Sequence, residues 1–270
     1  MMSGFESELL VYGLILGLCA GALAGTLAGL IGVGGGLIYV PVFYAFMPSQ
    51  GVGMALHIFA SMVAIVITGF FSARAHWRLG HVDKAMLGLL LPGLLIGAGL
   101  GLWSTLHLPE TLILLALATL DFWIAYDYGR QARADSYHHP SLLLFSGPIG
   151  YVAGALGIGG GSMLVPLLCR HTSLRFAVGT SAACVFFMAV GAVLMNLLAE
   201  PGWHLLLLAQ WPRLVGVWLG IALILPFCSH WSARLHTNMG EDALRLILRV
   251  VFILLACTLL IAAVMAYAPG

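Results

Sequence analysis

The chain has 270 residues, of which 61% are hydrophobic and only 8% are charged, and its formal net charge is +1. A soluble domain carries about 25% charged residues, so this composition argues against a soluble globular enzyme and predicts an integral membrane protein built from helices. There is no run of Lys and Arg that could follow a phosphate backbone, and we therefore expect no nucleic-acid partner.

Ten apolar segments follow one another along the chain, and a spanning helix needs about 20 apolar residues. Eight of them reach or approach that length, at 8–31, 54–73, 85–106, 111–128, 141–157, 176–199, 205–227 and 244–267. The other two, at 37–47 and 162–169, are too short to cross, and each directly follows a triple glycine.

The first segment carries glycine at every fourth position, at Gly13, Gly17, Gly21, Gly25 and Gly29. This spacing predicts a bare ridge along one helix, against which a second helix backbone can pack closely. We interpret the ridge as a packing surface and not as a ligand site.

The two triple glycines belong to a repeated pattern. "GLIGVGGGLIYVP" at 29–41 matches "GALGIGGGSMLVP" at 154–166, and the segment around Pro92 resembles the segment around Pro212 in the same order. Two ordered matches predict an internal duplication. We therefore divide the chain into a first membrane repeat at 1–128, a polar linker at 129–140 and a second membrane repeat at 141–270.

The distribution of Lys and Arg predicts how the repeats are oriented, because cytoplasmic loops collect these residues. The loop at 74–84 is basic, whereas its counterpart in the second repeat at 200–204 has no basic residue, and the following loops show the reverse. The repeats should therefore be inverted, each with three transmembrane helices and a re-entrant helical hairpin broken at the triple glycine. This all-α polytopic arrangement places the linker in the cytoplasm and both termini outside.

Inverted hairpins would bring two short helix N-termini together near the middle of the membrane. Free N–H groups and a partial positive charge at such termini suit a small anion. The candidate donors are the backbones of Gly34, Gly35, Gly36, Gly159, Gly160 and Gly161. The alternative is that the glycines only permit tight turns.

Four hydroxyl groups near these turns are further candidate ligands, namely Ser61, Ser162, Thr180 and Ser181. The alternative for each is an ordinary helical hydroxyl bonded to its own backbone. Two ionisable residues inside apolar segments, His57 and Asp121, are candidates for proton coupling. For His57 the alternative is a hydrogen-bonded interfacial histidine, and for Asp121 it is a structural partner.

These motifs resemble a known family. The paired GxGGG blocks ending in proline, "GTS" at 179–181, "SARAH" at 72–76 and "LPG" at 91–93 are similar to the TauE/SafE sulfite exporters over about residues 8–267. The resemblance implies a permease for sulfite, organosulfonates or related small sulfur anions in the bacterial inner membrane. This sequence departs from the pattern at Phe59-Ala60-Ser61, where a second GTS-like motif is expected, and at His57.

Together these observations predict a secondary transporter that exports such an anion by alternating access at a site near the membrane midplane. A passive anion channel and a permease for small non-sulfur carboxylates are the alternatives. No GxSG or HExxH motif is present, so we expect no enzyme activity. The five cysteines form no CxxC pair, and we expect no metal and no cofactor. The expected partners are the anion, the lipid bilayer and a coupling proton or ion. A homodimer is one assembly that the sequence allows.

Overall fold

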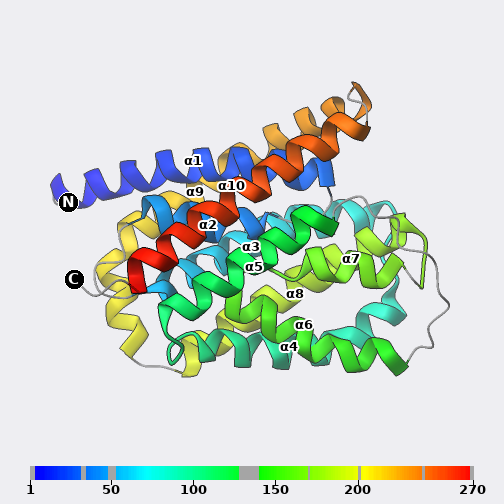
Figure 1. Ribbon diagram of the computed structural model, residues 1–270, viewed down its shortest axis with the longest axis horizontal. Coiled ribbons are helices and arrows are strands. Elements are labelled where there is room, and N and C mark those ends of the chain that lie inside the picture. The colour runs from blue at the N-terminus through cyan, green and yellow to red at the C-terminus, as the bar shows by residue number, and fades with distance from the viewer. Residues whose placement is uncertain are drawn as a thin grey trace.

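The computed structural model describes residues 4–31, 35–47, 53–127, 140–169, 171–199, 202–238 and 241–267. Within these ranges the regular secondary structure is entirely helical, which confirms the predicted class (Figure 1). The helices are α1 (Gly4–Ile31), α2 (Gly36–Phe46), α3 (Met54–Arg78), α4 (Lys84–Ser104), α5 (Glu110–Asp127), α6 (Pro140–Leu156), α7 (Gly161–Cys169), α8 (Leu174–Ala199), α9 (Gly202–Asn238) and α10 (Glu241–Tyr267). Nearly all of the predicted linker at 129–140 lies outside the described residues.

Five helical stretches are long and apolar enough to cross a membrane, namely Glu6–Thr26, Met54–Arg78, Lys84–Ser104, Arg175–Leu198 and Leu207–Cys228. Their outward faces carry large apolar side chains, among them Leu198 and Phe227, which are 85% and 73% exposed. A chain with several such helices and lipid-compatible outer faces is a multi-pass membrane protein.

The first long helix differs from the sequence prediction. The prediction makes α1 one arm of a hairpin that does not cross, whereas its stretch Glu6–Thr26 has the length and composition of a crossing. At about 1.5 Å per residue, a helix of this size exceeds the roughly 30 Å of the bilayer core. The short arms α2 and α7 have 11 and 9 residues, which is too few to cross, as expected.

Two helix pairs are held together by glycine seams. In the α1–α9 pair, a methyl group added to Gly13 or Gly17 would overlap the carbonyl oxygen of Arg213 or Val217. The α4–α6 pair shows the same contact, because a methyl group at Gly97 would overlap the carbonyl oxygen of Gly147. The interpretation of the first segment as a packing ridge is therefore confirmed for the described part of α1.

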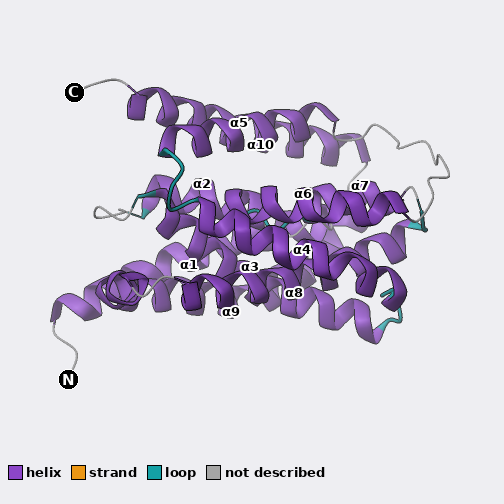
Figure 2. Cartoon of the chain, turned by 90° about the horizontal axis from the view of Figure 1, so that it is seen from below, coloured by secondary structure: helices purple, strands orange, loops and turns teal. Residues whose placement is uncertain are grey.

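The remaining contacts place the short arms on the central helices. The long helices α3 and α8 pack on each other, α2 packs on α3, and α7 packs on α8. The α5–α10 pair lies along one side of the molecule (Figure 2). The start of α1 and the end of α10 lie at the same end of the molecule (Figure 1). Gly35 and Gly36 before and at the start of α2, and the glycine turn before α7, are consequently buried among other helices.

Candidate functional site

The described end of the first glycine turn contacts the second glycine turn inside the helix bundle. We call residues 32–36 the first elbow and residues 157–161 the second elbow; residues 32–34, including the candidate Gly34, lie outside the described residues. Gly36 lies against the carbonyl group of Ile158 so closely that an added methyl group would overlap its oxygen. Ser61 on α3 donates a hydrogen bond of 2.7 Å to the carbonyl oxygen of Gly157. Gly36, at the described end of the first elbow, and Ser61 therefore both contact the second elbow, and a site between two hairpin tips near the membrane midplane stays a prediction.

The second elbow needs glycine for its backbone conformation. Gly157, Gly159 and Gly160 have φ angles of 68°, 75° and 67°, in the left-handed region that L side chains rarely adopt. A methyl group at Gly157 would also lie 2.9 Å from a side-chain carbon of Val40 on α2. The tight turn thus explains why Gly157, Gly159 and Gly160 are glycines. This agrees with the alternative interpretation, in which the glycines permit a turn.

The first elbow needs glycine for space. Gly35 has an ordinary φ angle of −72°. A methyl group there would lie 2.8 Å from Ala24 of α1 and 2.9 Å from the Tyr39 ring. The backbone conformation at position 35 therefore does not require glycine. Glycine is needed there because neighbouring groups lie too close to the backbone for a side chain to fit.

Both elbows end in the N-terminus of a short helix. In α7 the N–H groups of Met163 and Leu164 donate to the carbonyl oxygen of Gly160, at 3.1 and 2.9 Å. In α2 the N–H groups of Ile38 and Tyr39 donate to Gly35 in the same way, at 3.1 and 3.3 Å. The preceding N–H groups cannot bond within their own helix, because the first turn of a helix has no carbonyl partner for them.

Ser162 adds a side-chain group at the start of α7. The residue is 8% exposed, and its hydroxyl oxygen is buried with no hydrogen-bond partner among the described residues. A buried hydroxyl without a partner is costly. Ser162 is thus the one predicted hydroxyl whose free bonding capacity lies directly beside an elbow in the described part of the chain.

The other predicted hydroxyls have different surroundings. Ser61 is fully buried and bonded to the second elbow, as described above. Thr180 on α8 accepts a 2.9 Å hydrogen bond from the N–H of Asp83, in the loop between α3 and α4. Its neighbour Ser181 is buried. Thr180 therefore connects α8 to this loop, a contact that the sequence did not predict.

The second elbow, and Gly35 and Gly36 of the first elbow, are closed to solvent. The residues from Ala153 to Ser162 are buried. Beside the second elbow lie Ile65 and Val185, near the middles of α3 and α8. Two cavities lie away from the second elbow: one of 270 Å³ between α4 and α8, and one of 600 Å³ lined largely by α5 and α6. The described elbow glycines line neither of these two cavities.

The two predicted ionisable residues lie in different places. The His57 ring is 2% exposed, and its Nε2 lies 2.7 Å from the carbonyl oxygen of Met47 at the end of α2. Asp121 is 0% exposed on α5, which packs mainly on α10, and neither carboxyl oxygen has a hydrogen-bond partner among the described residues. A hydrogen-bonded histidine is thus observed, whereas the described residues include no hydrogen-bond partner for the Asp121 carboxyl group. Proton coupling by either residue stays a prediction.

Two aromatic residues near the elbows were not predicted. Tyr39 on α2 is fully buried, and its ring packs against Gly35. The indole N–H of Trp218 on α9 donates a 3.2 Å hydrogen bond to the carbonyl oxygen of Ala60 on α3. Aromatic residues in apolar segments are usually core residues, so no local signal distinguishes these two.

Comparison with known proteins agrees with this architecture. The family model described as sulfite exporter TauE/SafE matches residues 17–259. A probable membrane transporter protein of Haemophilus influenzae is 28% identical over 185 residues, covering 64% of this chain and 69% of the relative. The probable membrane transporter protein YunE of Bacillus subtilis is 26% identical, covering 86% of this chain and 91% of the relative. No solved structure matches. A multi-pass helical chain that this family model covers nearly from end to end belongs to the TauE/SafE family of membrane transporters.

Proposed function

We propose that the protein is a secondary transporter that exports sulfite, an organosulfonate or a related small sulfur oxyanion across the bacterial inner membrane. The observation that carries the proposal is the contact between the two elbows, with Ser162 beside them. N–H groups at helix N-termini and a free hydroxyl are donors that an oxyanion can accept from. The substrate class comes from the family to which the chain belongs.

Inverted repeats are supported by the way in which helices pair. If the second repeat begins at α6, then α1 corresponds to α6 and α4 to α9. The observed α1–α9 pair then corresponds to the observed α6–α4 pair. In the same way, the contact of α2 with α3 corresponds to that of α7 with α8. A twofold relation between the repeats accounts for this exchange of partners.

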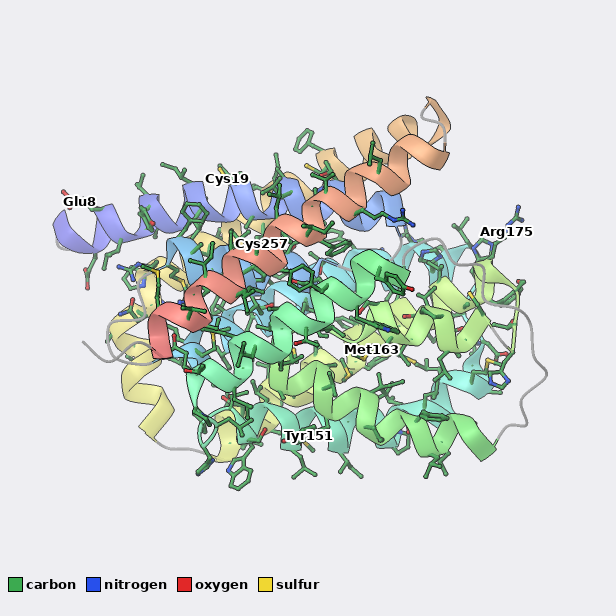
Figure 3. All side chains as sticks on the ribbon, in the orientation of Figure 1. Glu8, Cys19, Tyr151, Met163, Arg175 and Cys257 are labelled. Atoms are coloured by element: carbon green, nitrogen blue, oxygen red, sulfur yellow. The ribbon has the colours of Figure 1, made fainter. Side chains whose placement is uncertain are left out.

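The basic residues of the α3–α4 loop and of the start of α8 support the proposal that both regions lie on the cytoplasmic side. Arg74, Arg78 and Lys84 are exposed around the loop between α3 and α4, and Arg175 at the start of α8 lies near this loop, since Thr180 bonds to Asp83. Figure 3 shows Arg175 at the opposite end of the molecule from Glu8, with Met163, next to Ser162, between them. The positive-inside rule then places the Arg175 end in the cytoplasm.

Alternating access supplies a mechanism for this closed arrangement. A buried pair of elbows holds an anion away from water, and a movement of one repeat relative to the other exposes the elbows to each side in turn. Glycine at the contact lets the backbones approach each other and the ligand without side-chain obstruction. A passive channel needs a continuous aqueous path past the elbows, and the buried residues 153–162 disfavour it.

Substitution of Ser162 tests this proposal. Ser162→Ala removes one donor and leaves the glycine backbone unchanged, so the purified protein should bind sulfite and methanesulfonate at least about tenfold more weakly, since a hydrogen bond to a charged group contributes about 1.5–3 kcal/mol. Binding can be followed by tryptophan fluorescence, because the chain has seven tryptophans. The matched control is Ser104→Ala, because Ser104 donates to Gly101 within its own helix.

Three outcomes would contradict the proposal. The first is unchanged affinity of Ser162→Ala for both anions, which would remove Ser162 from the site. The second is wild-type protein that binds acetate and neither sulfur anion, which would favour the carboxylate permease. Flux in proteoliposomes at rates far above those of carriers would favour the channel.

A further inference from the structure

The Tyr39 hydroxyl lies at the start of α2, the short helix of the first elbow. Tyr39 is 0% exposed, and its ring leans back over Gly35. A methyl group added to Gly35 would lie 2.9 and 3.1 Å from two carbons of the ring, and the second of these carries the hydroxyl. Side chains on a helix point toward its N-terminus, and the Phe43 ring stacks on Tyr39 with 5.7 Å between centroids. The hydroxyl is thus held beside the N-terminus of α2.

This hydroxyl has unused bonding capacity. Its oxygen is buried and has no hydrogen-bond partner among the described residues. Thr68 on α3 and Cys228 on α9 lie close enough to interact with it. The one hydrogen of the Thr68 hydroxyl is directed at the carbonyl oxygens of Ala64 and Ile65, at 3.1 and 3.2 Å. Because an unpaired hydroxyl in an apolar interior is costly, the phenolic O–H of Tyr39 is a donor suited to a ligand.

The N-terminus of α2 has further donors beside this hydroxyl. Its N-cap residue, Gly35, makes no side-chain capping bond. The first N–H groups of a helix have no carbonyl partner within it, and they carry a partial positive charge. In the repeated pattern, Leu37 occupies the position of Ser162 and has no hydroxyl. Tyr39 therefore supplies at the first elbow the hydroxyl that Ser162 supplies at the second.

One face of α3 connects the Tyr39 hydroxyl with the second elbow. Ile65 on this face lies beside Gly159. Thr68 follows Ile65 by three residues, which places both side chains on the same side of the helix, and Thr68 interacts with Tyr39. The neighbours of Gly159 and of the Tyr39 hydroxyl are thus about one helical turn apart along α3.

We propose that Tyr39 is a substrate-binding residue of the first repeat, which donates its phenolic hydrogen to the anion at the elbows. Ser162 donates from the second repeat, so the anion is held by one hydroxyl from each repeat and by N–H groups at the starts of α2 and α7. A sulfonate group has three oxygens, enough to accept from both hydroxyls and from a helix N–H group. This inference rests on the proposed function and adds a residue to its site.

Tyr39→Phe tests the inference, because it removes only the hydroxyl group. The affinity of the purified protein for methanesulfonate, measured by isothermal titration calorimetry in detergent, should fall at least about tenfold, as expected for the loss of a hydrogen bond to a charged group. Without the anion, the midpoint of thermal unfolding should equal or exceed that of the wild type, since the change removes an unpaired buried hydroxyl. Tyr151→Phe, the same change in an exposed tyrosine, should leave the affinity unchanged.

Thr68→Val is a second variant that distinguishes ligand binding from a structural bond between Tyr39 and Thr68. It should leave the affinity for methanesulfonate unchanged. If Tyr39→Phe and Thr68→Val both lower the midpoint of unfolding and neither weakens binding, Tyr39 is structural and the inference is wrong. Unchanged affinity of Tyr39→Phe, with weaker binding by Ser162→Ala, would overturn the role of Tyr39 and leave the proposed function standing. Wild-type protein that binds neither sulfite nor methanesulfonate would refute the proposed function and this inference with it.

Discussion

At the level of single residues, the buried hydroxyls that the sequence predicts as ligands have separate roles. Ser61 satisfies a carbonyl group of the second elbow, Thr180 holds the loop between α3 and α4, and Ser162 is left with bonding capacity among the described residues. A hydroxyl that is already bonded stabilises the fold, whereas a free buried one is suited to a ligand. The same residue type therefore has different consequences when it is removed.

Ser61→Ala should destabilise the protein by about 1–3 kcal/mol, because it leaves the buried carbonyl group of Gly157 without its partner. Thermal unfolding in detergent, monitored by circular dichroism, measures this effect. Thr258→Ala is the control, since Thr258 is exposed and bonds to Leu255 in its own helix, and it should change stability by less than about 0.5 kcal/mol. Equal stability of the two variants would show that the Ser61 bond is not part of the folded state.

At the scale of helices, glycine spacing determines which long helices pair. Gly13 and Gly17 face the backbone of α9, and Gly97 and Gly101 face the backbone of α6. Helices in lipid gain little from apolar burial against one another, so close backbone packing is what favours one partner over another. The two seams therefore fix the long helices that surround the elbows.

Gly17→Leu should separate α1 from α9 and destabilise the protein by at least about 1–3 kcal/mol, the usual cost of overpacking. The control is Gly88→Leu on the exposed side of α4, where an added methyl group meets nothing within 4 Å. Thermal stability of the two variants in the same detergent gives the comparison. A Gly17→Leu protein as stable as Gly88→Leu would mean that this seam is not a close contact.

The helices and the elbows could be predicted from sequence because their signals are local. A run of glycines before a short apolar segment marks an elbow, and glycine at every fourth residue marks a seam. Contacts between distant residues have no such signal: Thr180 and Asp83 are 97 positions apart, and Trp218 and Ala60 are 158 apart. The apolar segment 8–31 is long enough to predict a crossing helix, but the loop charges favoured a hairpin that does not cross, and loop charges do not report how long each arm is.

In the whole molecule, we expect the α3–α4 loop and the start of α8 to lie on one side of the membrane. The loop between α4 and α5 should lie on the other side, because α4 has the length and composition of a crossing helix. Contacts between the α3–α4 loop and α8, such as that of Gly179 with His81, keep the first two regions together. Orientation is therefore a property that can be tested without any substrate.

Cysteine labelling tests this orientation in a variant that lacks the five native cysteines. His107→Cys should react with a membrane-impermeant maleimide in intact cells, whereas Leu79→Cys and Ser173→Cys should react only in inverted vesicles. All three of these positions are exposed, and a permeant maleimide should label all three variants as a control. Labelling of positions 79 and 173 from opposite sides would rule out the proposed topology.

The position of a bound anion tests most directly whether the two elbows form the binding site. Selenite has the shape and charge chemistry of sulfite, and its selenium atom can be located by anomalous X-ray scattering in crystals soaked at several concentrations. We expect one peak between the two elbows, within hydrogen-bonding distance, about 3.5 Å or less, of the Ser162 hydroxyl and of N–H groups at the starts of α2 and α7. The peak should be absent in Ser162→Ala at the lower concentrations. Selenium bound only elsewhere, with the elbows still packed against each other, would contradict the account.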